Sequence, residues 1–321
     1  MLQGHVFHSF TGKPWREGSL YQLSQFLGGM PPAIFLFLTG ITMGFLMDSV
    51  EKKGHGAGER VYQALRRSSY LFVLAYAFRF QMWLFAWPAS PWTDLFRVDI
   101  LNAMGLGLSA LSLTAFFSTA KRVRLCAVLG ILIAAISPLV SQLDWSGAPN
   151  LLKNYLVPDS NYFSFFPWAS YLAFGVAAGS LLRVSNDEAI ERTMQWGALS
   201  GFALILGGQY FGGIPYSIYP KSEFWLDSPA LVLIKLGAIL LMLSTAYVWN
   251  AYVVRDQWSW IRTLGMASLP VYWIHTELVY GRWLWFWKED LGPPQTALVA
   301  ALVIALMLVV ALGRQRWPRT A

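Results

Sequence analysis

The sequence predicts an all-α polytopic membrane protein, with about nine full transmembrane helices and a truncated N-terminal helix. Of the 321 residues, 56% are hydrophobic and 13% are charged, and the mean hydropathy is +0.45. Soluble domains carry roughly 25% charged residues, so this composition favours a lipid environment. The connections between the apolar segments are too short to fold alone, and we therefore expect a single transmembrane domain over residues 1–321.

Long apolar windows supply the predicted helices. About 20 apolar residues are needed for one helix to cross the hydrocarbon core of a bilayer. Windows close to that length cover residues 31–47, 69–87, 100–117, 125–143, 163–182, 194–211, 229–248, 264–285 and 296–312.

The start of the chain differs from these windows. MLQGHVFHSF is apolar, but it gives only about half of a crossing before Lys13. It also lacks the basic first region of a signal peptide. We expect the outer half of a helix whose inner half is missing from this sequence; a short or re-entrant segment is the alternative.

Basic residues alternate between the connections and predict the orientation of the chain. Every second connection is basic: Lys52, Lys53, Arg60, Arg66 and Arg67; Lys121, Arg122 and Arg124; Arg183 and Arg192; Arg255 and Arg262; Arg314, Arg316 and Arg319. The positive-inside rule places these loops and the C-terminus in the cytoplasm, with the loops near Trp145 and Tyr216 outside. Because the charge is spread over loops and not gathered in one patch, the net charge of +7 does not indicate nucleic-acid binding.

Orientation converts residue number into depth, since each helical residue advances about 1.5 Å. It predicts a polar layer in the outer half of the membrane. Ionisable groups at that depth are costly and usually functional. The members of this layer are His5, His8, Arg79, Arg97, Asp99, Asn102, Trp168, Lys235, His275 and Glu277.

Most of these residues also have a structural interpretation. Arg79 can pair with Asp99, or its long side chain can extend outward to the interface. Lys235 can extend outward in the same way. Arg97 and Asp99 can form a solvated ion pair, and Asn102 can bond across helices. Trp168 can belong to the aromatic belt at the membrane interface.

The histidines are the strongest candidates for chemistry. Neutral imidazole can take a proton from a nucleophile near neutral pH and return it to a leaving group. His275 and Glu277 are two residues apart on the predicted helix and face different neighbours, so they cannot form one acid and base pair. The only cysteine, Cys126, lies within an apolar window. No intramolecular disulfide or cysteine metal cluster is possible, and we expect no metal.

Several ordered motifs resemble a known family. GHVFHSF, LYQLSQFLGGMPPAIFLFLTGITMGF, AFRFQ, RVDILNAMGLGL, FFPWASYLAFGVAAG and SLPVYWIHTELVYGR follow one another along nearly the whole chain. Together they resemble the bacterial relatives of heparan-alpha-glucosaminide N-acetyltransferase, in the wider transmembrane acyltransferase group that includes the acyltransferase-3 proteins.

The resemblance implies a multi-pass transferase of the bacterial cytoplasmic (inner) membrane. Its acyl donor would be acetyl-CoA from the cytoplasm, and its acceptor an extracytoplasmic sugar or envelope glycan. A polar residue near the outer end of the first helix, often His, is implicated in transfer in this group, and His5 holds the matching place here. The family's Arg-Gly pair, about ten residues before that His, cannot occur in a sequence that starts at Met1. Association of the chain into a homo-oligomer is compatible with this resemblance.

These expectations combine into one mechanistic hypothesis. His5 would deprotonate the acceptor amine or hydroxyl, and His275 and Glu277 would orient the acceptor or relay protons. Arg79, Arg97, Asp99, Asn102 and Trp168 are expected at oxyanion or substrate-binding positions. Two alternatives are a proton-coupled transporter, in which the same buried ions line a pathway, and a non-catalytic membrane protein that binds an envelope glycan.

Overall fold

A computed structural model of the chain describes residues 1–216, 218–255 and 257–316. Within these residues the elements are helices, and no strand is assigned. Arg319, one of the basic residues used to orient the chain, lies outside the described residues.

The helices fall into two compact units, each built from segments far apart in sequence. The first unit comprises residues 1–31, 78–94 and 249–321, and the second comprises residues 32–77 and 95–248. Helices α3 and α4 contribute residues to both units. Each unit is described by itself below, and the prediction of one domain over residues 1–321 remains a prediction.

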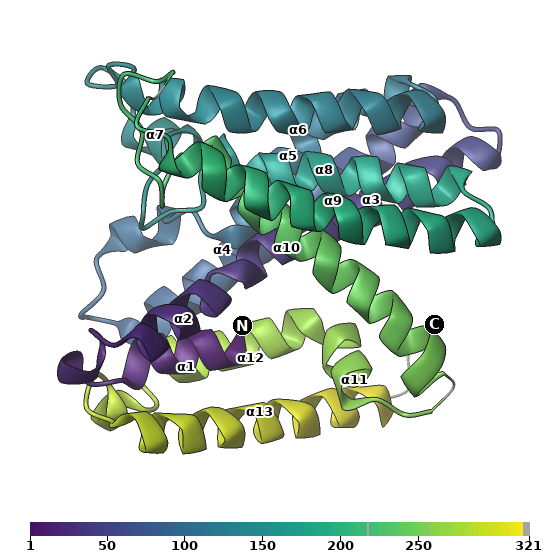
Figure 1. Cartoon of the computed structure of the whole chain (residues 1–321). Helices are drawn as coiled ribbons and strands as arrows, with labels where there is room; N and C mark the ends of the chain where they lie inside the picture. The colour runs from purple at the N-terminus through teal and green to yellow at the C-terminus, as the bar shows by residue number, and fades with distance from the viewer. Residues whose placement is uncertain (217, 256, 317–321) are drawn as a thin grey trace. The chain divides into compact units, whose positions relative to one another are not determined.

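The first unit contains the two ends of the chain. Its elements are α1 (Leu2–Phe10), the short turn η1 (Lys13–Trp15), α2 (Ser19–Gly28), the end of α4 (Ala57–Ala86), the π-helical turn η4 (Trp249–Val254), α11 (Trp260–Met266), α12 (Ser268–Tyr280), η5 (Trp285–Trp287) and α13 (Pro293–Arg316). In Figure 1, α1, α12 and α13 lie side by side, and their residues contact one another.

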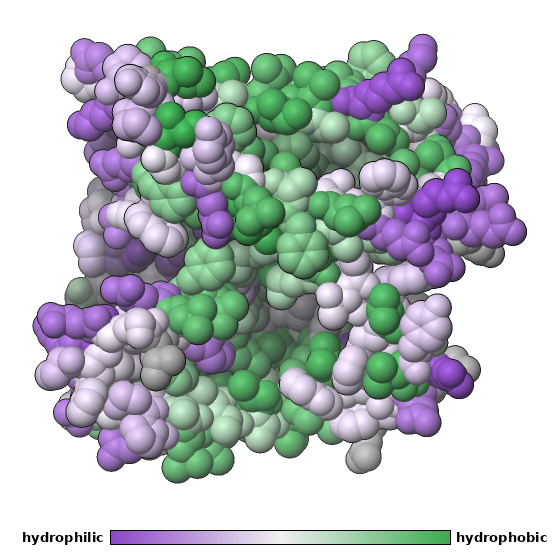
Figure 2. Space-filling model, in the orientation of Figure 1, coloured by the Kyte–Doolittle hydropathy of each residue, from purple (hydrophilic) through white to green (hydrophobic). Residues whose placement is uncertain are grey.

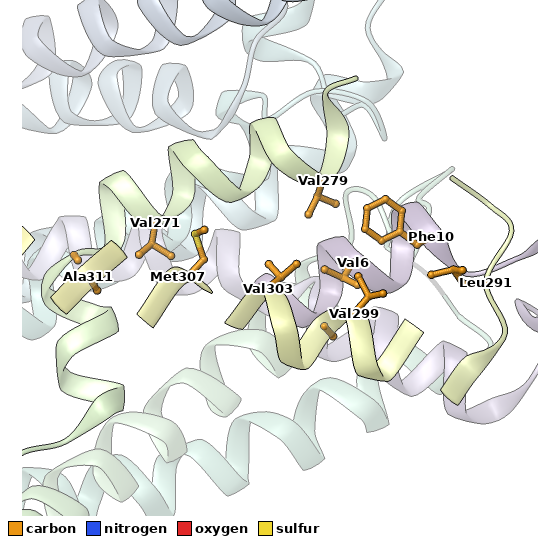
Figure 3. Close-up of a cluster of buried hydrophobic side chains, with 11 residues drawn as sticks. Val6, Phe10, Val271, Val279, Leu291, Val299, Val303, Met307 and Ala311 are labelled. Atoms are coloured by element: carbon orange, nitrogen blue, oxygen red, sulfur yellow. The ribbon is translucent and has the colours of Figure 1, made fainter. Parts of the chain in front are cut away.

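One apolar cluster holds these three helices together. It combines residues that are at most 9% exposed: Val6, Phe10, Ala267, Val271, Val279, Leu291, Val299, Ala300, Val303, Met307 and Ala311. Figure 3 shows the side chains of α1 and α12 directed toward those of α13. Burial of one such side chain contributes about 1.5–3 kcal/mol, so this cluster fixes the short helix α1 against α12 and α13.

The second unit is a bundle of longer helices. Its elements are α3 (Met30–Lys52), most of α4, α5 (Ile100–Leu111), η3 (Ser112–Phe116), α6 (Thr119–Gln142), α7 (Asn150–Leu156), α8 (Phe165–Val184), α9 (Asp187–Gly213) and α10 (Pro229–Val248). The short turn η2 (Trp92–Phe96) spans the boundary between the units. The most extensive pairings are α9 with α10 and α6 with α8.

Glycines allow close approach of helices in the second unit. A Cβ atom on Gly175 of α8 would overlap the carbonyl of Phe37 on α3, and one on Gly179 would lie 2.5 Å from the carbonyl oxygen of Ile41. A side chain at either position would force α3 and α8 apart, so these glycines serve close helix packing.

Seven helical segments are long and apolar enough to cross a membrane within the described residues. The all-α polytopic membrane fold is therefore confirmed, while the predicted count of nine spans stays a prediction. Figure 2 shows, on each unit taken separately, hydrophobic residues over the middle of the helices and hydrophilic residues near helix ends. This distribution is typical of membrane-spanning segments.

One predicted helix is wrong in its bounds. Residues 264–285 were expected to form one continuous helix, but the chain breaks between α11 and α12 at Ala267 and leaves the helix after Tyr280. Pro270 explains the break, because its ring clashes with the carbonyl four residues earlier, at Met266, where α11 ends. The resulting α12 has only 13 residues and is not among the seven candidate spans.

Candidate functional site

His5 and His275 meet in the first unit although 270 residues separate them. His5 Nδ1 lies 2.9 Å from His275 Nε2, a hydrogen-bond distance. The ring centroids are 5.0 Å apart and the ring planes are inclined by 22°. His275 is fully buried and His5 is half-buried.

The apolar cluster positions this pair. On α12, Val271, His275 and Val279 are spaced by four residues and share the face that packs on α1 and α13. On α1, Val6 follows His5 directly, and it belongs to the same cluster. His275 therefore replaces an apolar residue in the middle of a buried stripe, where Leu or Phe would serve packing better.

Backbone contacts fix the C-terminal end of α1. Glu289 N donates to Ser9 O at 3.0 Å, and Leu291 N donates to Phe10 O at 2.9 Å. Thr11 and Leu291 form a parallel bridge, in which Gly12 N donates to Leu291 O at 2.9 Å. The segment that follows α12 is thereby bound to the residues that end α1.

Two side chains tie the same region to the end of α12. Ser9 Oγ donates to the carbonyl oxygen of Val279 at 3.0 Å, and Lys288 Nζ donates to that oxygen at 2.6 Å. Lys288 also lies over the rings of Phe10 and Tyr280, at 5.9 Å and 5.7 Å from their centroids. Burial lowers the pKa of the Lys288 ammonium. These contacts limit the sliding of α1 along α12, which would separate the histidines.

Aromatic rings surround the pair. The ring of Tyr280 meets His5 edge to face at 5.1 Å, and Tyr272 meets His275 at 6.0 Å. The Tyr280 hydroxyl lies 3.4 Å from His8 Nδ1. His8 itself is exposed and lies against Tyr280, whereas His5 is the histidine of α1 that bonds to His275.

Glu277 lies on a different side of α12. Trp283 Nε1 donates to its Oε1 at 3.1 Å, whereas its Oε2 is buried without a hydrogen-bond partner in the described part of the chain. His275 and Glu277 have separate partners, as expected, and the partner of His275 lies on a neighbouring helix, α1. The partner of Glu277, Trp283, lies instead in the segment directly after α12.

Four other predicted site residues lie in the second unit. Asp99 Oδ1 accepts from the backbone N–H groups of Leu101 and Asn102 and caps α5. Asn102 Oδ1 accepts from Asp99 N at 3.1 Å, and Asn102 Nδ2 donates to the Tyr155 hydroxyl at 2.9 Å. Both side chains thus have a structural use at the start of α5.

Arg97 and Trp168 also have partners in the second unit. Arg97 Nη2 donates to Asn161 O at 3.4 Å, and its guanidinium lies 6.0 Å from the Tyr162 ring centroid. Lys235 Nζ lies 5.2 Å from the centroid of the Trp168 ring, a cation–π distance. A role of Arg97, Asp99, Asn102 or Trp168 in substrate binding remains a prediction.

Arg79 belongs to the first unit and Asp99 to the second. Their predicted pairing, and the predicted oxyanion role of Arg79, therefore stay predictions. The structure thus brings His5 and His275 into contact across 270 residues, while Asp99 and Asn102 bond to each other at the start of α5.

Sequence reasoning missed a charge cluster at the ends of helices in the second unit. Glu51 Oε2 lies 3.5 Å from Arg60 Nη1 and 3.4 Å from Arg122 Nη2, and it accepts from Thr119 Oγ1 at 3.0 Å. Arg122, which the sequence places in a basic connection, is 0% exposed. The signal was Asp48 and Glu51, two acids at the end of an apolar window, spaced to share a helical face.

No three His, Cys, Asp or Glu side chains lie close enough to hold a metal ion in the regions that the structure describes.

The part of the chain that matches a known protein family lies mainly in the second unit. The family model described as heparan-alpha-glucosaminide N-acetyltransferase, catalytic, matches residues 10–210. No curated protein sequence and no solved structure matched the chain. His5 and His275 both lie outside the matched residues, so their pairing is a finding independent of that match. The match covers more than half of the chain. Together with the candidate membrane spans of the chain, it supports a membrane acetyltransferase-like function. The chain belongs to the heparan-alpha-glucosaminide N-acetyltransferase family.

Proposed function

We propose that this protein is an integral membrane acyltransferase that moves acetyl from cytoplasmic acetyl-CoA to an extracytoplasmic amino sugar or envelope glycan. Its place would be the bacterial cytoplasmic membrane, with the C-terminus inside. The observation that carries the proposal is the contact between His5 Nδ1 and His275 Nε2 at 2.9 Å, in a chain of an N-acetyltransferase family.

His5 is the general base in this proposal. Its ring is half-buried, whereas that of His275 is fully enclosed, so His5 is the imidazole that an acceptor reaches. His5 removes a proton from the acceptor amine or hydroxyl as nitrogen or oxygen attacks the thioester carbonyl. The new C–N or C–O bond forms, the C–S bond breaks, and the proton passes to the thiolate of CoA.

Glu277 is assigned to the acceptor. Its Oε2 is a buried acceptor atom without a partner among the residues that the structure describes, and such atoms are rare in folded proteins because they lose hydration without compensation. A donor-rich group, such as the ammonium or a hydroxyl of a sugar, would satisfy it. Arg79, which belongs to the same unit as His5, is retained as a proposed donor to the developing oxyanion.

Transfer in a reconstituted system tests the proposal. The purified chain in liposomes receives acetyl-CoA labelled in the acetyl group on one side and glucosamine on the other, and labelled product is counted. We expect His5→Ala to lower turnover about 10²- to 10⁴-fold, the usual effect of removing a general base. His8→Ala is the matched control, because His8 lies one turn away on α1 but is exposed.

Three results would contradict the proposal. Full turnover by His5→Ala would remove His5 from the chemistry. Movement of a solute across the liposome membrane with no acyl donor, without any acetyl transfer, would favour the transporter, and glycan binding without either activity would favour a non-catalytic binding protein.

A further inference from the structure

The His275 ring is held between two defined partners. Its Nδ1 bonds to the carbonyl oxygen of Val271, one turn earlier on α12, and its Nε2 faces His5 Nδ1 at 2.9 Å. A carbonyl oxygen can only accept a hydrogen bond. The proton of this bond therefore belongs to His275 Nδ1.

This assignment determines, one after another, which of the remaining ring nitrogens carry a proton and which carry a lone pair. A neutral imidazole has one N–H and one lone pair, so His275 Nε2 carries a lone pair. The short contact to His5 Nδ1 then requires that His5 Nδ1 carries the proton and donates. The lone pair of His5 is consequently left on Nε2, the nitrogen directed away from His275.

The neutral state of His275 follows from its surroundings. The partners of the ring are a peptide carbonyl and the imidazole of His5, neither of which is a carboxylate, and the ring is 0% exposed. The nearest acidic residue along α12, Glu277, bonds to Trp283 instead. A buried cation without a carboxylate partner is costly, so the resting pair is uncharged.

We infer that His275 is a positioning residue that holds His5 in the tautomer whose Nε2 lone pair is free to act as base. This inference rests on the proposed function for its use in catalysis. When His5 Nε2 takes the acceptor proton, the new positive charge is shared through the bond from His5 Nδ1–H to His275 Nε2. When that Nε2 proton passes to the CoA thiolate, both rings return to their neutral state, and the proton count balances.

The tautomer can be measured without any enzymatic activity. The chain has four histidines, so a sample labelled with ¹⁵N only at histidine gives few ring signals, which His5→Ala and His275→Ala assign. In liposomes we expect His5 to carry its proton on Nδ1 with Nε2 unprotonated, and His275 to show the same pattern. A resting signal with a proton on His5 Nε2 would overturn the inference.

Two substitutions of His275 separate positioning from packing. The side-chain carbonyl of His275→Gln can still accept from His5 Nδ1, whereas His275→Phe fills the space without an acceptor. We expect His275→Phe to lower kcat about 10- to 100-fold, the range found when the partner that orients a functional histidine is removed. We expect His275→Gln to restore part of this loss, and KM for acetyl-CoA to stay unchanged in both variants.

The outcomes distinguish the two proposals. If wild-type protein transfers no acetyl but His5 shows the expected tautomer, the proposed function fails while the positioning of His5 by His275 stands. If wild-type protein is active and His275→Phe keeps both full kcat and the wild-type His5 signal, the positioning role is wrong and the proposed function survives. Equal losses in His275→Gln and His275→Phe, with the His5 tautomer unchanged, would indicate packing alone and also reject the inference.

Discussion

Gly4 of α1 and Gly28 of α2 face each other so closely that neither position has room for a side chain. A Cβ atom on Gly4 would lie 2.5 Å from the Cα atom of Gly28, and one on Gly28 would lie 2.9 Å from the Cα atom of Gly4. Next to this contact, Gln3 Nε2 donates to Ser24 Oγ at 2.7 Å. Because Gly4 directly precedes His5, the packing of α2 on α1 also sets where the His5 ring lies.

Gly4→Ala should therefore destabilise the protein and impair transfer. The new methyl group meets backbone, which cannot rotate away, and overpacking of this kind costs about 1–3 kcal/mol. Thermal unfolding in detergent and acetyl transfer measure the two effects. Gly18→Ala is the control, because a Cβ atom there meets no heavy atom within 4 Å. A Gly4→Ala protein as stable and as active as Gly18→Ala would show that α1 and α2 do not pack in this way.

Glu277→Gln should weaken acceptor binding while it preserves the fold. The amide oxygen can still accept from Trp283 Nε1, so the local packing stays, but the negative charge is lost. A hydrogen bond to a charged group contributes about 1.5–3 kcal/mol, and we expect KM for the amino-sugar acceptor to rise about 10- to 100-fold. Hydrolysis of acetyl-CoA without acceptor should remain at the wild-type rate. An unchanged KM for the acceptor would exclude Glu277 from its binding.

Glu51→Ala should destabilise the second unit, since it leaves Arg122 buried without its carboxylate partner. Removal of one member of a buried ion pair costs about 3–5 kcal/mol. The loss should fall below that range here, because the Glu51 side chain is 29% exposed and Arg122 also donates to the carbonyls of Thr114 and Phe117. Thermal unfolding compares it with Glu188→Ala at an exposed site. Equal stability of the two variants would mean that Glu51 contributes nothing to holding Arg122.

The two ends of α6 should lie on opposite sides of the membrane. Lys121 is an exposed residue in the first turn, and Gly147 follows the other end and is open to a side chain. In a Cys126→Ser background, Gly147→Cys in intact cells should react with an impermeant thiol reagent, and Lys121→Cys should react only after the cells are opened. Labelling of Lys121→Cys from outside would reverse the predicted topology, including the cytoplasmic C-terminus.

Local patterns in the sequence were sufficient for the class of fold. Apolar windows predict helices because each backbone polar group in lipid must be satisfied within its own segment. The window over residues 229–248 coincides with α10, Pro229–Val248. The same reasoning failed over residues 264–285, because a hydropathy window does not register that Pro270 interrupts the backbone bonds between α11 and α12.

The sequence likewise showed the individual candidate site residues, but not which of them lie in contact. The sequence by itself determined that His5, His275 and Glu277 are polar groups in apolar segments, and that His275 and Glu277 face different neighbours. Tertiary structure alone decided that His275 meets His5, because 270 residues separate them and the contact depends on how α1, α12 and α13 share one apolar cluster. It also buried Arg122 beside Glu51, whereas the capping of α5 by Asp99 and Asn102 is a contact between residues three apart. Side-chain partners far apart in sequence are fixed by packing, and no local pattern encodes which helices become neighbours.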